Sequence, residues 1–151
     1  MSRRRRAFTV TELFIIVIVV GVLAVIAMPR LDFSVISKQS AEVAARRIVT
    51  DLRRTRRLAI SHAARASGFK LVMTGSAPYT GYEIISSPPE EVLDSYSLDP
   101  VVSCAGGNLF QFGPKGELSE NSSTWLTVSS KGKRYIIRIT RATGMVECKQ
   151  G

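Results

Sequence analysis

The chain has 151 residues, the size of one domain and not of a multidomain enzyme. Apolar residues make up 45% and charged residues 22%, and 21 Lys and Arg against 12 Asp and Glu give a net charge of +9. The single histidine, His62, excludes a multi-histidine metal centre, and the sequence contains no nucleophile–base pair, phosphate loop or metal-ligand spacing. We therefore predict no enzymatic activity, no cofactor and no metal.

The N-terminus combines a basic run with an apolar segment. Four consecutive arginines precede Ala7, and an unbroken apolar block covers residues 13–28. At about 1.5 Å per helical residue, residues 8–28 are long enough to cross a hydrocarbon core of about 30 Å. The arginines predict that the N-terminal end is cytoplasmic. We therefore expect a transmembrane helix.

Three interpretations of this segment compete: a cleaved secretory signal, a plain membrane anchor and a more specific signal. The apolar block exceeds the usual signal core of about 7–15 residues, and no Ala-x-Ala cleavage site follows it. A plain anchor does not explain Glu12, because a carboxylate costs about 2.5–3.5 kcal/mol at the middle of a membrane. Glu12 is therefore a candidate functional residue, unless it snorkels to the interface.

The first residues resemble the class III signal of type IV pilins and type II secretion pseudopilins. The match consists of the arginines, a small residue at Ala7, residues 8–13 with Glu12, and a later glycine and proline, Gly21 and Pro29. Ala7 departs from the glycine that the family usually has.

In that family a prepilin peptidase cleaves before the apolar segment. The resemblance implies cleavage between Ala7 and Phe8, N-methylation of Phe8, and a kink at Pro29. It also implies that Glu12 pairs with the terminal amine of a neighbouring subunit in a filament, which would set the register of assembly.

The resemblance implies a bacterial inner-membrane protein with a single span and a periplasmic C-terminal domain. We expect four segments: a cleaved basic leader (1–7), a transmembrane helix (8–30), an amphipathic periplasmic helix (31–67) and an antiparallel β part (68–151).

The expected second helix carries an arginine stripe opposite an apolar face. The stripe predicts contact either with DNA phosphates or with acidic patches of neighbouring subunits, and Arg46, Arg53 and Arg57 are the candidate residues. Subunit contact is favoured, because removing the leader leaves 17 basic against 12 acidic residues, or +5. Arg56 projects on the apolar side, where we expect it to snorkel or to meet an acid from a sheet.

Beyond Gly68 the sequence alternates between short β-like runs and turn signals. We predict strands at 69–74, 82–86, 99–103, 109–112, 125–129, 134–141 and 145–148, with a loop at 87–97. The predicted fold class is α+β, pilin-like: a long N-terminal helix, membrane-spanning in its first half, packed on antiparallel β-sheets.

Residues 109–116, 125–128 and 137–146 look like the C-terminal region of GspH/FimT-type minor pseudopilins, which implies two antiparallel sheets against the helix. Met145 departs from the arginine that is common there, and DNA-binding members of the FimT type would use that arginine. Cys104 and Cys148 allow one disulfide in an oxidising compartment, and two free thiols are the alternative.

The leading hypothesis is a minor pseudopilin near the tip of the periplasmic pseudopilus of a type II protein secretion system. Its expected partners are other pilin-like subunits, prepilin peptidase, the inner membrane and secreted cargo. The alternative is a FimT/FimU-like minor pilin that primes type IV pili or binds DNA for uptake. A third hypothesis is an anchored binding domain that does not polymerise. Nucleic acid ranks below a protein partner.

Overall fold

A computed structural model describes residues 9–27, 33–63, 68–86 and 89–151 of the chain. The chain divides into two compact units, Met1–Phe33 and Ser34–Gly151. Each unit is described by itself below.

The first unit contains helix α1, Val10–Ala27. Thr9 caps its start: Thr9 Oγ1 accepts a hydrogen bond from the backbone N–H of Glu12 at 3.3 Å, within the Thr-x-x-Glu sequence that is typical of a capping box. Large apolar side chains cover all faces of the helix and are strongly exposed, from 45% at Ile16 to 72% at Val10. Over residues 10–23, whose side chains the structure describes, the helix therefore has no continuous polar face to present to water.

The expectation of one long N-terminal helix that spans a membrane in its first half is wrong. The chain forms two helices, and α1 ends at Ala27, before Pro29. Proline lacks an amide hydrogen and disfavours helical geometry in the residue before it, which accounts for a helix end here.

None of the helices in the described part of the chain is long and apolar enough to cross a membrane. This finding overturns the expected location, a single-pass inner-membrane protein with a periplasmic C-terminal domain.

Helix α2, Phe33–Ser61, belongs to the second unit except for its first residue. Small and aliphatic side chains form its buried face: Ala41, Ala44, Ala45, Ile48, Val49, Leu52 and Ala59. The alanines let neighbouring elements approach the helix axis closely. The one buried polar side chain among the described residues of this helix, Thr55, donates its hydroxyl to the Asp51 carbonyl at 2.7 Å, which satisfies its hydrogen bond.

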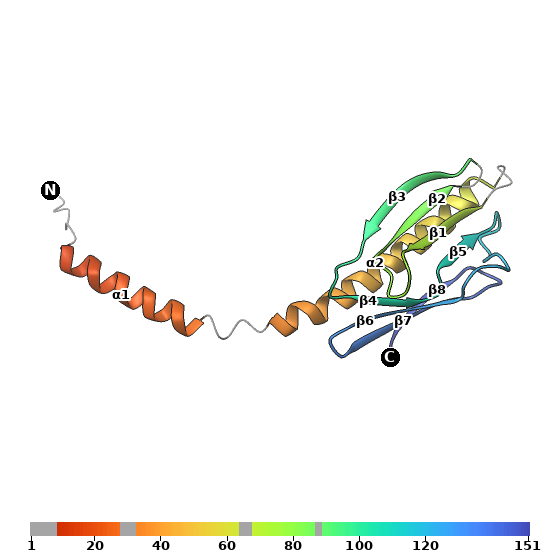
Figure 1. The fold of residues 1–151 in the computed structure, drawn as a ribbon. Coiled ribbons are helices and arrows are strands. Elements are labelled where there is room, and N and C mark those ends of the chain that lie inside the picture. Colours follow the sequence, from red (N-terminus) through yellow and green to blue (C-terminus); the bar gives the residue numbers. More distant parts are fainter. Residues whose placement is uncertain (1–8, 28–32, 64–67, 87–88) are drawn as a thin grey trace, which may run out of the picture. The chain divides into compact units, whose positions relative to one another are not determined.

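Eight strands form two antiparallel sheets (Figure 1). The first sheet has the order β3-β2-β1-β5 and the second the order β4-β6-β7-β8. The bounds are β1 Phe69–Thr74, β2 Gly81–Ser86, β3 Glu91–Ser97, β4 Ser103–Gly106, β5 Leu109–Phe112, β6 Trp125–Ser130, β7 Lys133–Ile139 and β8 Val146–Gln150.

The inner faces of both sheets and the buried face of α2 share one hydrophobic core. Leu71, Phe110 and Phe112 of the first sheet are fully buried, as are Leu126 and Ile137 of the second. Side chains alternate in and out along β1, β6 and β7, as strands with one covered face require. Each large side chain buried in this way contributes about 1.5–3 kcal/mol.

Two predictions for the β part are wrong. The predicted loop at 87–97 contains strand β3, and the predicted strand at 99–103 is replaced by β4 at Ser103–Gly106. Strand β3 lies at a sheet edge with nearly every residue exposed, so its sequence lacks the alternation by which a half-buried strand is found. Strand β4 has four small residues and no bulky side chain to mark it.

Polar and aromatic contacts attach α2 to strands β2 and β3. The Tyr82 hydroxyl donates to Asp51 Oδ2 at 2.5 Å, and Arg54 Nη1 lies 2.7 Å from Asp94 Oδ2. The Arg47 guanidinium carbon lies 4.3 Å from the centroid of the Tyr96 ring, at cation–π distance. Burial raises the pKa of Tyr82 above its ordinary value, and the Asp51 hydrogen bond raises this pKa further.

Replacing Tyr82 by Phe should lower the free energy of unfolding by about 1.5–3 kcal/mol. The variant lacks the hydroxyl that donates a hydrogen bond to the Asp51 carboxylate, and that carboxylate is mostly shielded from water. The raised pKa means that folding favours the neutral phenol, so this stabilisation is complete below pH ~10 and declines as the pH rises above that value. Urea unfolding at neutral and alkaline pH measures both effects. Tyr96→Phe is the control, because no hydrogen bond of its hydroxyl is present in the described structure; equal losses for the two variants would contradict the prediction.

Candidate functional site

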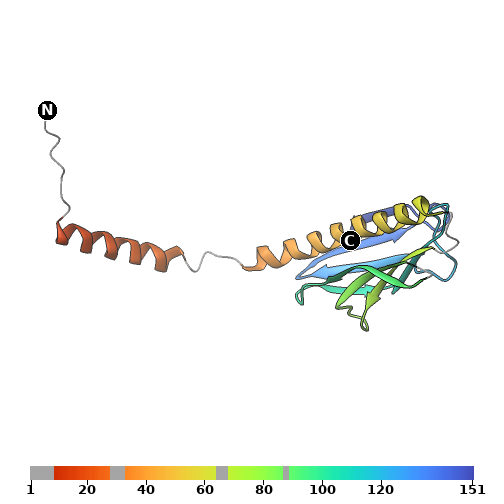
Figure 2. The same ribbon diagram turned by 90° about the horizontal axis from the view of Figure 1, so that it is seen from above.

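A basic groove of about 610 Å³ lies between α2 and β8, and we call it the α2–β8 groove. It is lined by Arg53, Arg56 and Arg57 on the helix and by residues 144–149 on the other side. Figure 2 shows β8, in dark blue, running alongside the yellow part of α2.

The six arginines of the described part of α2 fall into two groups. Three face carboxylates: Arg46 lies 2.7 Å from Glu42, Arg47 3.8 Å from Asp51, and Arg54 2.7 Å from Asp94. The other three, Arg53, Arg56 and Arg57, form no ion pair with any described residue, and all three line the groove. The positive charge of α2 that lacks a carboxylate partner is therefore gathered in one place.

Two of the groove arginines are held by backbone carbonyls. Arg53 Nη2 donates to the Val146 carbonyl at 3.1 Å, and Arg56 Nε donates to the Gly116 carbonyl at 3.1 Å. Carbonyl acceptors orient the guanidinium groups without neutralising them, so each keeps its charge and further N–H donors. The groove can therefore bind an anionic group through preorganised donors.

Only part of this group was predicted from the sequence. Of the three candidate residues, Arg53 and Arg57 line the groove, whereas Arg46 is engaged by Glu42. Arg56, expected to snorkel or to meet an acid, instead binds a carbonyl beside the other two. The spacing i, i+3, i+4 of residues 53, 56 and 57 is the signal that could have revealed the group, because it places all three on one helix face.

Two glycines lie next to the groove residue Arg56. A Cβ at Gly144 would lie 1.9 Å from the Gly116 carbonyl oxygen, and a Cβ at Gly116 would lie 2.7 Å from Ile60 Cδ1. Both residues also have positive φ angles, +62° and +79°. Only glycine allows the two turns to touch here, and this contact sets the position of the Gly116 carbonyl that holds Arg56.

The expected disulfide between Cys104 and Cys148 is not formed, and both thiols are free. The two residues lie on β4 and β8, the opposite edges of one sheet, with two strands between them. Three strand spacings of about 4.8 Å each exceed the Cα separation of about 7 Å that a disulfide tolerates. Cys104 is buried, which raises its pKa to about 12, whereas Cys148 is exposed beside the groove.

The N-terminal site residues are described only in part. Ala7, Phe8 and Pro29 lie outside the described residues. Glu12 lies in the first turn of α1 and is exposed. Its carboxylate is placed favourably at the positive end of the helix dipole, a local role that sequence reasoning missed although the spacing from Thr9 signals it.

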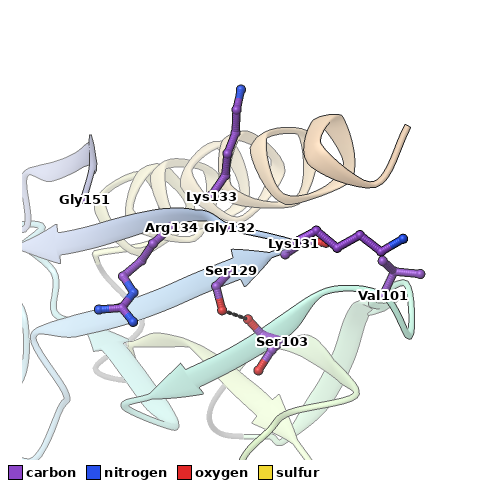
Figure 3. A pocket seen from close by; sticks show the side chains of 9 residues that line it. Val101, Ser103, Ser129, Lys131, Gly132, Lys133, Arg134 and Gly151 are labelled. Carbon is purple, nitrogen blue, oxygen red and sulfur yellow. Dashed lines mark hydrogen bonds between the residues drawn. The ribbon is translucent and has the colours of Figure 1, made fainter. Parts of the chain in front are cut away.

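A second concavity of about 550 Å³ lies around the turn between β6 and β7. Its basic residues are Lys131, Lys133 and Arg134. Figure 3 shows Lys133 pointing toward the helix side of the sheet and Arg134 away from it, while Lys131 extends beside Val101. Since these charges diverge, the α2–β8 groove is the better candidate for an anion-binding site.

No group of three or more His, Cys, Asp or Glu is placed to hold a metal ion within the described ranges. Comparisons with protein-family models, with curated proteins and with solved structures found no match.

Replacing Gly144 by Ala should destabilise the protein more than replacing Gly132 by Ala. Both glycines have positive φ angles, so each substitution costs about 1–2 kcal/mol in backbone strain. A Cβ at Gly132 meets nothing within 4 Å, whereas one at Gly144 collides with the Gly116 carbonyl. Urea unfolding of the two variants measures the difference, and equal losses of stability would contradict the close contact between Gly144 and Gly116.

Proposed function

We propose that this chain is a structural subunit of a filament, a minor pseudopilin near the tip of the pseudopilus of a type II protein secretion system. One observation carries the proposal: helix α1 presents large apolar side chains on every face, all strongly exposed, immediately after a capped start at Thr9 and Glu12. The N-terminal signal that this sequence resembles belongs to proteins that assemble through such a helix.

An exposed apolar helix requires apolar surface around it. Burying one large aliphatic side chain is worth about 1.5–3 kcal/mol, and α1 exposes many of them. In the proposed filament the same helices of neighbouring subunits supply that surface. Because apolar contacts have little directional preference, a second kind of contact must set how the subunits align.

Glu12 meets that requirement in the proposal. Its carboxylate would be the one acidic group of α1 within an apolar helix bundle, so it needs a cationic partner there. The amine of Phe8, released by cleavage after Ala7 in a neighbouring subunit, is the partner we propose. Pairing a charge that is costly to bury favours one register over the others.

The α2–β8 groove supports a role in protein contacts as well. Its three arginines have no carboxylate partner within the described chain, so an acidic surface of another subunit would gain favourable interactions there. In the proposed filament the apolar helix α1 holds subunits together, and the charged groove binds an acidic surface of a neighbouring subunit.

Processing is the first test. The chain isolated from cells with active prepilin peptidase should lack residues 1–7 and carry one added methyl group, and the chain from cells without the peptidase should retain Met1. Intact-mass spectrometry measures both. Ala7→Leu is the control, since a bulky residue at the cleavage position should block removal; an unprocessed wild-type chain would refute the proposal.

The second test separates the charge of Glu12 from its place in the capping box. Glu12→Gln keeps a residue that fits the capping box but removes the charge, so it should leave α1 intact and reduce incorporation into filaments about tenfold or more, the factor for about 1.4 kcal/mol of lost pairing. Crosslinking to neighbouring subunits in cells measures incorporation. Thr9→Ala, which removes the cap but keeps the charge, should assemble better than Glu12→Gln; the opposite order would assign Glu12 to capping alone.

A further inference from the structure

We infer that the α2–β8 groove receives residues 90–93, Glu-Glu-Val-Leu, of a second copy of this chain. The inference rests on the proposed function, since it names the partner that the groove contacts in the filament. It is argued below from the donor segment, the acceptor groove and their positions in the fold.

The donor segment exposes two neighbouring large apolar side chains at a sheet edge. Val92 is 54% exposed and Leu93 is 42% exposed. The pairing of β2 with β3 shifts here, because Ile84 faces Asp94 while Ile85 faces Val92, and Leu93 has no partner in the register. Such a bulge interrupts regular strand pairing and turns a side chain outward. The segment therefore projects as a knob and is not suited to simple strand addition.

Two carboxylates, Glu90 and Glu91, directly precede Val92 and Leu93. Glu90 is hydrogen-bonded to Lys70 of its own chain, while Glu91 is exposed and forms no ion pair among the described residues. A single acidic segment thus combines exposed apolar surface with a carboxylate that lacks a partner. Surface of this mixed kind marks a contact with another protein.

The groove offers the complementary surface. Arg53, Arg56 and Arg57 supply charges without carboxylate partners, and two exposed apolar residues lie beside them. Met145 lines the groove and is 53% exposed. Ile60 is 42% exposed and lies against Gly116, as Arg56 does. Docking would pair Glu91 with the arginines and cover Val92 and Leu93 with Met145 and Ile60.

The two surfaces lie on different sides of α2, so one chain does not satisfy its own groove. Arg54 contacts Asp94 of β3, whereas the adjacent Arg53 contacts Val146 of β8. Strands β3 and β8 are also edges of different sheets. A contact between unlike surfaces is heterologous; it repeats from copy to copy and builds a filament when the rotation between copies does not close into a ring.

The experiment uses the exposed Cys148 as a native probe of the groove. Full-length wild-type chain, kept in mild detergent because of α1, is mixed with a size-tagged chain carrying Val92→Cys and Cys148→Ser and is then oxidised. A disulfide between the two chains then reports that position 92 of one copy reaches Cys148 of the other. The control replaces Val92→Cys by Lys131→Cys, an exposed position at the β6–β7 turn. Any association through α1 contributes equally to both mixtures.

We expect about tenfold more mixed disulfide from position 92 than from position 131, which corresponds to a preference of about 1.4 kcal/mol. Arg57→Glu in the wild-type partner should reduce the yield, and Glu91→Arg in the tagged chain should restore it against that partner. Equal yields from positions 92 and 131, or a yield unaffected by Arg57→Glu, would overturn the inference.

Further measurements distinguish an unfolded variant from a folded variant that does not dock. Buried Cys104 should stay unreactive toward a thiol reagent in every folded variant, so label located at Cys104 by peptide mass mapping identifies any chain that has unfolded. Glu91→Lys in the tagged chain places a positive charge opposite the groove arginines and should also reduce the disulfide yield. Because Glu91 is exposed, this variant replaces Arg57→Glu if the latter unfolds. Removal of residues 1–7 by the peptidase does not depend on this groove, so normal processing with no 92–148 disulfide would refute the inference and leave the proposed function standing.

Discussion

The structure of the second unit depends on α2, which is packed on one face and charged on its flanks. Its alanines and aliphatic residues complete the core that both sheets share. On one flank Arg47 and Arg54 hold β3 through Tyr96 and Asp94, and on the other Arg53 holds β8 through a carbonyl. Among the described residues no strand of one sheet pairs with a strand of the other, so the packing of α2 against both sheets helps to fix the position of one edge strand relative to the other.

This arrangement explains why the arginines of α2 are not equivalent. Those on the β3 side meet carboxylates or an aromatic ring, so their charge is largely compensated. Those on the β8 side meet carbonyl oxygens, which fix their geometry and leave their charge. Exposed ion pairs contribute little to stability, commonly below about 1 kcal/mol. The difference therefore matters less for folding than for what the groove can bind.

Sequence reasoning worked where burial is one-sided and failed where an element is exposed or defined by long-range contacts. The pattern at 69–74 and 109–112 marks two strands whose inner residues Leu71 and Phe110 are fully buried, and both were predicted with the observed bounds. Strand β3 carries no such signal. The sequence spacing places the three groove arginines on one helix face. That Arg46 differs from them, because Glu42 pairs with it, is seen only in the folded contacts. The disulfide prediction failed because cysteine count carries no information on strand order.

The two proposed assembly surfaces, α1 and the α2–β8 groove, differ in how specifically they align neighbouring subunits. The apolar side chains of α1 are alike on all faces, so they favour association in many relative positions. The groove presents three arginine charges next to Met145, two of them held by backbone carbonyls, so it accepts few arrangements. In the proposed filament, α1 supplies affinity in many registers, and the groove charges favour one of those registers. Charged residues select partners at coiled-coil interfaces in the same way. On this argument a change in the groove should alter the register of neighbouring subunits more than the amount assembled, while a change in α1 should do the reverse.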